Sequence, residues 1–125
     1  MQPETAALGV GYFGASTGAG AALVAAAGDG RIGAVVSRGG RPDLAGAALP
    51  HVAAPTLLIV GSLDGQVIEL NRLADSRMRC ERQIAIVPGA SHLFEEPGTL
   101  DEVVILARDW FVSHLHAVKE KSRGT

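Results

Sequence analysis

The stretch GYFGASTGAG, residues 11–20, decides how this chain is interpreted, because it contains two overlapping signatures. Residues 14–18, GASTG, match G-x-S-x-G, the sharp strand-to-helix turn that presents a nucleophilic serine, here Ser16. Residues 9–14, GVGYFG, match G-x-G-x-x-G, the turn that brings a dinucleotide pyrophosphate to a helix N-terminus. Both signatures need a strand, a turn and a helix, so the local sequence does not separate them.

Composition narrows the class of protein. The chain has 125 residues, 47% of them hydrophobic, and a net charge of -2, which predicts one folded domain. Acids and bases are interspersed, so we expect no nucleic-acid partner and no membrane surface. The single cysteine, Cys80, excludes an internal disulfide and a multi-cysteine metal site. We expect a cytoplasmic protein, because no apolar stretch reaches the ~18 residues of a membrane span and MQPETAALG lacks the basic start of an export signal.

Short apolar runs alternate with helical patterns along the chain. The predicted strands are 9–13, 32–37, 56–61 and 82–87, and the predicted helices are 17–27, 67–79 and 99–118. This alternation predicts the α/β class, with a parallel four-stranded sheet in chain order and helices on both faces. The Gly- and Pro-rich segment 38–55 is expected to contain no long regular element. Residues 1–118 are therefore interpreted as the domain, and 119–125 as a charged flexible tail.

The serine interpretation needs two partners, because a free hydroxyl is a poor nucleophile without a base and an orienting carboxylate. In α/β folds the three residues arrive in the order Ser, Asp or Glu, His, each in a loop after a strand. Asp64 follows the strand 56–61, and His92 follows the strand 82–87. The carboxyl ends of parallel strands meet at one edge of a sheet. We therefore expect His92 within about 4 Å of the Ser16 hydroxyl and Asp64 on the far side of the ring.

Other interpretations of these residues stay open. Asp64 could be a solvated turn residue, His92 a loop histidine bonded to a backbone carbonyl, and the Gly-rich turn a mere connection. In the dinucleotide interpretation, Arg38 after the second strand would meet a 2′-phosphate. That interpretation is less favoured, because short-chain dehydrogenases need a Tyr and a Lys four apart, and the only tyrosine is Tyr12.

Three segments resemble the nucleophile, acid and histidine segments of an α/β-hydrolase: residues 11–27, 55–72 and 86–104. Among these enzymes the chain is most similar to the dienelactone-hydrolase-like group, which includes members fused to phosphoribosyltransferases. The resemblance implies the C-terminal half of an α/β-hydrolase fold, no cofactor and no metal. It also implies Ser16 as nucleophile, His92 as general base and then general acid, and Asp64 as the group that orients the imidazole. Dienelactone hydrolases proper carry a cysteine nucleophile, so their lactone substrate is not inherited by a chain with Ser16.

The chain departs from that group in where its nucleophile lies. In the group the nucleophile follows several strands of a larger sheet, whereas Ser16 is close to Met1. We therefore expect the first strands to be missing, with 1–5, MQPET, inside a longer protein. The backbone N–H of Thr17 supplies one oxyanion donor, but the second would come from a loop after an early strand. The strand 9–13 is expected at an open edge, where an upstream hydrolase segment or a second copy of the chain would pair with it.

The resulting prediction is a serine hydrolase of the carboxylic ester type, acting on a small ester, thioester or lactone with reduced activity. A non-catalytic remnant that pairs with another chain, and an NADP-binding Rossmann-type domain, are the alternatives. Arg38 and Arg41 are candidates to bind a substrate carboxylate or phosphate, or else solvated loop charges.

Overall fold

The computed structural model describes residues 10–124, and the side chains of residues 10–115. Its elements follow in the order β1 (Val10–Ala15), α2 (Thr17–Gly28), β2 (Ile32–Arg38), the 3-10 helix η1 (Pro42–His51), β3 (Thr56–Gly61), α3 (Gly65–Arg77), β4 (Arg82–Val87) and α4 (Thr99–Gly124). The predicted strand start at Gly9 and the predicted domain start at residue 1 lie outside the described residues.

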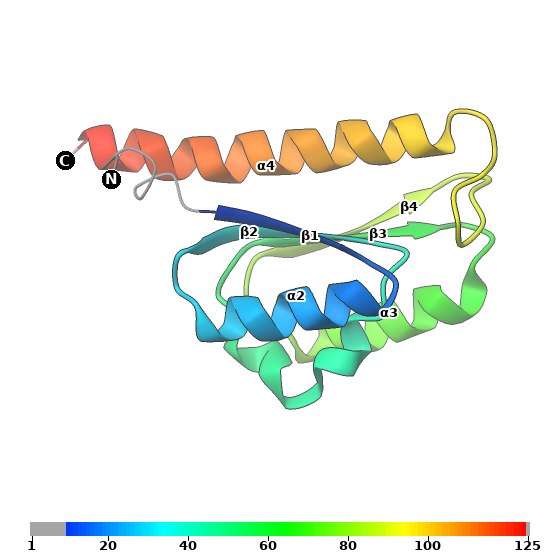
Figure 1. Ribbon diagram of the computed structural model, residues 1–125, viewed down its shortest axis with the longest axis horizontal. Coiled ribbons are helices and arrows are strands. Elements are labelled where there is room, and N and C mark those ends of the chain that lie inside the picture. Colours follow the sequence, from blue (N-terminus) through cyan, green and yellow to red (C-terminus); the bar gives the residue numbers. More distant parts are fainter. Residues whose placement is uncertain (1–9, 125) are drawn as a thin grey trace.

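The four strands form one parallel sheet in the order β1-β2-β3-β4, as the sequence predicts (Figure 1). A helix lies in the chain between each strand and the next, and consecutive strands connected in this way usually lie side by side in a parallel sheet. β1 and β4 are consequently the two edges of the sheet. The predicted fold class and strand order are confirmed.

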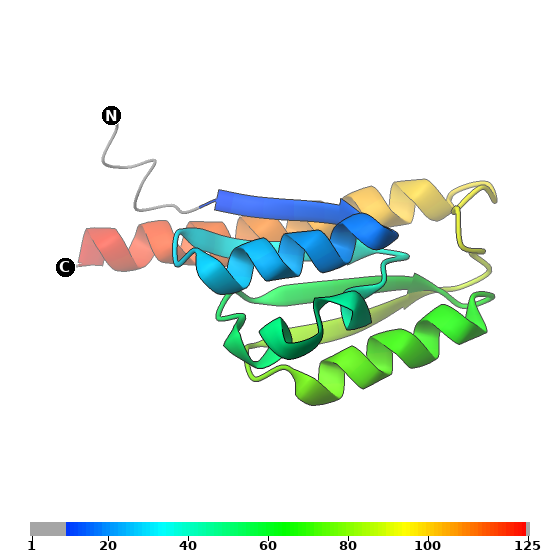
Figure 2. The same ribbon diagram turned by 60° about the horizontal axis from the view of Figure 1, so that its bottom comes forward.

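Helices cover both faces of the sheet. α4 lies along one face, while α2, η1 and α3 lie against the other (Figures 1 and 2). Side chains of β2 alternate between the two hydrophobic clusters: Val35 belongs to the one under α2, and Val36 to the one under α4. All residues of β3 are buried, which is expected of a central strand with both faces covered.

β1 runs to Ala15 rather than ending at Phe13, and α3 spans Gly65–Arg77 rather than 67–79. Two further segments differ more from the sequence prediction. The segment expected to be irregular contains η1, which has Pro42 at its start and a kink at Gly46, where φ is 50°. A proline is tolerated in the first turn of a helix, and the glycine bends this helix without preventing it. α4 continues to Gly124, through residues expected to form a tail, because Lys119, Glu120 and Lys121 favour helix and no breaker precedes that glycine. That 119–125 is flexible stays a prediction.

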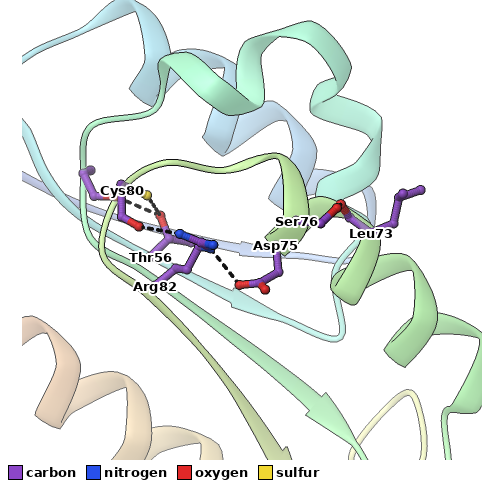
Figure 3. A network of polar contacts seen from close by, with 7 residues as sticks. Thr56, Leu73, Asp75, Ser76, Cys80 and Arg82 are labelled. Carbon is purple, nitrogen blue, oxygen red and sulfur yellow. Dashed lines mark hydrogen bonds and ion pairs between the residues drawn. The ribbon is translucent and has the colours of Figure 1, made fainter.

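A polar network lies at the amino ends of β3 and β4 (Figure 3). Ser16, Asp64 and His92 follow the carboxyl ends of their strands, so the network lies at the other end of the sheet. Arg82 Nε donates to Asp75 Oδ1 at 2.8 Å, and Thr56 Oγ1 donates to the Ala54 carbonyl at 2.9 Å. Cys80 is half-buried beside Thr56, with 4.0 Å between Sγ and Oγ1.

Burial raises the pKa of the Cys80 thiol, so less of it is present as the reactive thiolate at neutral pH. We expect iodoacetamide to alkylate Cys80 several-fold more slowly than it alkylates glutathione at pH 7. Alkylation should leave the reactivity of Ser16 unchanged, because the thiol lies at the other end of the strands. The rate is measured by intact-protein mass spectrometry over time, with Cys80→Ser as the control that lacks the thiol. Alkylation as fast as that of glutathione would contradict the prediction.

None of the helices in the described part of the chain is long and apolar enough to cross a membrane.

Candidate active site

Ser16 stands between β1 and α2 in a backbone conformation that L-residues seldom adopt, with φ 50° and ψ -126°. Gly14 permits this turn, since a Cβ there would lie 2.7 Å from both Ala19 Cα and the Gly18 carbonyl oxygen. Any larger residue would push α2 away from β1. Ser16 is the N-cap residue of α2, but its hydroxyl makes no capping hydrogen bond and is free for another partner.

Asp64 follows β3 and is the N-cap residue of α3, again with no side-chain capping bond. Two hydrogen bonds tie its loop to the loop after β4. The Leu63 N–H donates to the Ala90 carbonyl at 3.0 Å, and the Gly89 N–H donates to Ser62 Oγ at 2.8 Å. The pairing of β3 with β4 thus continues into the two loops and holds them together.

His92 lies in this second loop, between β4 and α4, and two contacts shape its backbone. The Ser91 N–H donates to Glu96 Oε1 at 3.0 Å, and this bond lowers the pKa of the Glu96 carboxyl. Phe94 takes a positive φ of 55° and buries its ring in the hydrophobic cluster under α4. The loop is therefore anchored on both sides of His92 by groups close to it in sequence.

The sheet brings the three predicted residues together. The distance between Ser16 Oγ and His92 Nε2 is 3.2 Å, and the distance between His92 Nδ1 and Asp64 Oδ2 is 2.7 Å. The Asp64 side chain is 15% exposed and that of His92 is 40% exposed, so the acid is the more enclosed of the two. The expected distances are met. The catalytic roles of the three residues stay predictions.

The loop after β2 forms a backbone hydrogen bond with Ser16 and packs against its turn. The Arg41 N–H donates to the Ser16 carbonyl at 2.9 Å. The preceding residue, Gly40, packs so tightly against Ser37 and Ala19 that a Cβ there would overlap with both side chains. Only glycine allows the loop this close an approach to the turn that carries Ser16.

Asn71 connects this loop to α3, the helix that begins next to Asp64. Its side chain is fully buried, and Nδ2 donates to the Gly40 carbonyl at 3.2 Å and to the Val67 carbonyl at 2.8 Å. Asn71 was not among the residues predicted for the site. The available signal was a polar residue on the apolar side of a helix, at the spacing of Val67, Asn71 and Ala74.

Replacing Asn71 with leucine is expected to lower the free energy of unfolding by roughly 1–3 kcal/mol, because the buried Gly40 carbonyl loses its side-chain donor. Ser16 should also react more slowly with a serine-directed probe, since Gly40 precedes the residue that bonds the Ser16 carbonyl. Urea denaturation measures the first effect.

The matched control on the same helix is Arg72→Ala. Arg72 forms an exposed ion pair with Glu69, so its loss should change the free energy of unfolding by less than about 0.5 kcal/mol. Equal effects of the two substitutions would contradict a specific role for Asn71.

Thr17 is the first residue of α2. Its backbone N–H lies in the first helical turn, where amides have no acceptor within the helix and the helix dipole favours negative charge. An oxyanion formed at a carbonyl carbon attached to Ser16 would lie next to this amide.

The two candidate arginines differ in their surroundings. Arg41 forms a two-pronged ion pair with Asp43, with Nη2 to Oδ2 at 2.9 Å and Nε to Oδ1 at 3.0 Å. This pair lowers the pKa of the Asp43 carboxyl. Arg38 instead lies over the Phe94 ring, with 5.8 Å between its Cζ and the ring centroid. Its buried Nε has no hydrogen-bond partner among the described residues. Of the two, only Arg41 is paired with a carboxylate among the described side chains.

A metal site is not apparent in the part of the chain that the structure describes, where no three His, Cys, Asp or Glu side chains gather in a way that could hold an ion.

Comparison with known proteins gives relatives of two kinds. No family model matches the chain. Two curated proteins from strains of Mycobacterium tuberculosis, whose names provisionally call them phosphoribosyl transferases, are 66% identical to it over 116 residues. The alignment covers 91% of this chain but 26% of each of those proteins, so the chain spans about a quarter of their length.

Two solved structures share the architecture. A dienelactone hydrolase from Anabaena variabilis is 60% identical with a TM-score of 0.83, over 84% of this chain and 49% of that one. An esterase domain from Rhodothermus marinus is 18% identical with a TM-score of 0.75, over 85% of this chain and 61% of that one, and this likeness concerns the fold alone.

Proposed function

We propose that this chain, which has an α/β-hydrolase fold of the dienelactone-hydrolase-like kind, carries the catalytic triad of a serine hydrolase that cleaves small carboxylic esters or thioesters. One observation carries the proposal: a serine in a strained strand-to-helix turn, 3.2 Å from a histidine whose other nitrogen lies 2.7 Å from a carboxylate. Fold likeness alone would not carry it, because one fold hosts many activities.

The geometry suits acyl transfer to water. His92 Nε2 would accept the Ser16 proton as Oγ attacks the carbonyl carbon, while Nδ1–H donates to Asp64 and fixes the tautomer. The oxyanion would be stabilised by the Thr17 N–H. His92 then returns the proton to the leaving alcohol or thiol, which departs and leaves an acyl group on Ser16. Water, deprotonated by His92, releases the acid and restores the serine.

The two candidate arginines bear on the choice of substrate. Arg38 would pair with a carboxylate or phosphate of the substrate, whereas Arg41 is held by Asp43.

The phosphoribosyl transferase name of the mycobacterial relatives belongs to proteins of which this chain spans 26%. We therefore do not carry that named activity over to this chain.

Covalent labelling tests the proposal directly. A fluorophosphonate probe should phosphonylate Ser16, and mass spectrometry of the proteolysed chain should find the adduct on the peptide that contains residues 11–20. Ser16→Ala should remove the adduct, and Ser91→Ala, next to His92 but outside the proposed triad, should retain it.

Two results would overturn the proposal. An adduct that persists in Ser16→Ala would place the reactive group elsewhere. No adduct on the wild-type chain, even when joined to a complete hydrolase sheet, would favour the non-catalytic remnant.

A further inference from the structure

Glu96 connects the backbone next to His92 to the start of α4. Its Oε1 accepts the N–H of Ser91, the residue before His92, at 3.0 Å. Its own carbonyl accepts two bonds from Thr99, the first residue of α4, one from the N–H at 3.1 Å and one from Oγ1 at 2.8 Å. The Glu96 side chain thus reaches back to the His92 segment from a backbone that is fixed to a helix.

The turn that carries His92 contains a strained residue. The Phe94 N–H donates to the Ser91 carbonyl at 3.2 Å, which closes a β-turn over residues 91–94 with His92 at its second position. Phe94 has a φ of 55°, a region in which residues other than glycine are destabilised. The bond from Ser91 to Glu96 fixes the first residue of this turn, so it helps to hold a conformation that the local sequence does not favour.

A small displacement of the turn would separate His92 from its partners. The ring lies between Asp64 Oδ2, 2.7 Å from Nδ1, and Ser16 Oγ, 3.2 Å from Nε2. A shift of the turn by about 1 Å would take the longer of these contacts outside hydrogen-bond range. The position of Ser91 therefore matters to the contact between His92 and Ser16.

The bond between Ser91 and Glu96 is charge-assisted. The Ser91 N–H lowers the pKa of the Glu96 carboxyl, so this group is ionised at neutral pH. Hydrogen bonds to an ionised acceptor are shorter and stronger than those between neutral groups. Because the pKa is lowered, the bond is present above the ordinary pKa of a glutamate and is lost as the pH falls through the lowered value.

We infer that Glu96 is a positioning residue for His92. Its carboxylate holds the Ser91 N–H and, through the turn over residues 91–94, holds the imidazole against Ser16 and Asp64. The effect of Glu96 on the reactivity of Ser16 rests on the proposed function, whereas its effect on the turn does not.

Two measurements on Glu96→Ala test this role. Hydrogen exchange at the Phe94 amide should become at least about tenfold faster, although the substitution does not touch that bond, because the turn loosens. Phosphonylation of Ser16 by a fluorophosphonate probe should slow by at least about tenfold, because the base is displaced. Circular dichroism and urea denaturation show whether each variant folds.

Conservative substitutions separate the hydrogen bond from the charge. Glu96→Gln keeps an oxygen acceptor of the same reach, so it should restore both rates to within about threefold of wild type. Glu96→Asp keeps the charge but is one methylene shorter, so it should behave as Glu96→Ala does, and it replaces that variant if Glu96→Ala does not fold. The matched control is Glu95→Ala, which removes the adjacent, exposed acid and should leave both rates unchanged.

Three results would overturn the positioning role. The first is exchange at the Phe94 amide that is unchanged in Glu96→Ala. The second is wild-type labelling of Ser16 in a Glu96→Ala chain whose turn has loosened. The third is equal slowing by Glu95→Ala, which would make the effect one of net charge. If Ser16 is not labelled even in the wild type, the proposed function fails, and the exchange rate at Phe94 alone decides whether Glu96 holds the turn.

Discussion

Phosphonylation of Ser16 is expected to slow by about 10²–10⁴-fold when His92 is replaced with alanine, the usual contribution of a positioned general base. His92 Nε2 is 3.2 Å from the serine hydroxyl, and no other histidine side chain described in the structure forms a hydrogen bond with Ser16. Without it, no histidine among the described side chains is placed to accept the hydroxyl proton. The measurement is the second-order rate constant of labelling by a fluorophosphonate probe.

Asp64→Asn is expected to slow the same labelling reaction. The amide would still fill the space 2.7 Å from His92 Nδ1, but it no longer favours the tautomer whose Nε2 accepts the serine proton. A loss of up to about 10⁴-fold accompanies such a change in a well-formed triad. A buried ion pair with only a structural role would instead lower stability and leave the labelling rate unchanged.

His51→Ala is the matched control for both variants, because His51 is exposed at the end of η1. Its labelling rate should equal that of the wild type. If His92→Ala labels Ser16 as fast as His51→Ala does, His92 is not the base and the triad assignment is wrong.

Turnover of p-nitrophenyl acetate is expected to rise by at least about 10²-fold when this chain is fused to the part of the Anabaena variabilis dienelactone hydrolase that it does not match, because the fusion would add a second oxyanion donor. The Thr17 N–H offers one donor, and the second comes from a loop after an early strand in this fold. In this chain β1 leads directly into Ser16, so a strand and loop of the added segment would supply the second donor.

The same experiment with Ser16→Ala separates the chain's own chemistry from any contribution of the added half. The rise should vanish in Ser16→Ala. A fusion that folds, as circular dichroism would show, but gives no rise in turnover would contradict the proposed function.

Much of the fold could be predicted from the sequence, because its signals are local. The boundaries of β3 and β4 were predicted to the residue, since TLLIVG and RQIAIV are apolar runs bounded by turn residues. η1 was missed because its helical turns are short and interrupted by Gly46, and short 3-10 turns have no periodic signature of their own.

The sequence by itself determined which residues are candidates for the site, because Ser16, Asp64 and His92 each follow a strand whose signal is local. Only the tertiary structure decided their distances, since Ser16 and His92 are 76 positions apart and Asp64 and His92 are 28 apart. It also decided that Asn71 supports the Ser16 turn, through a bond to a glycine 31 positions away. Such contacts depend on how closely helices and loops pack on the sheet, which the spacing of residues along a chain does not specify.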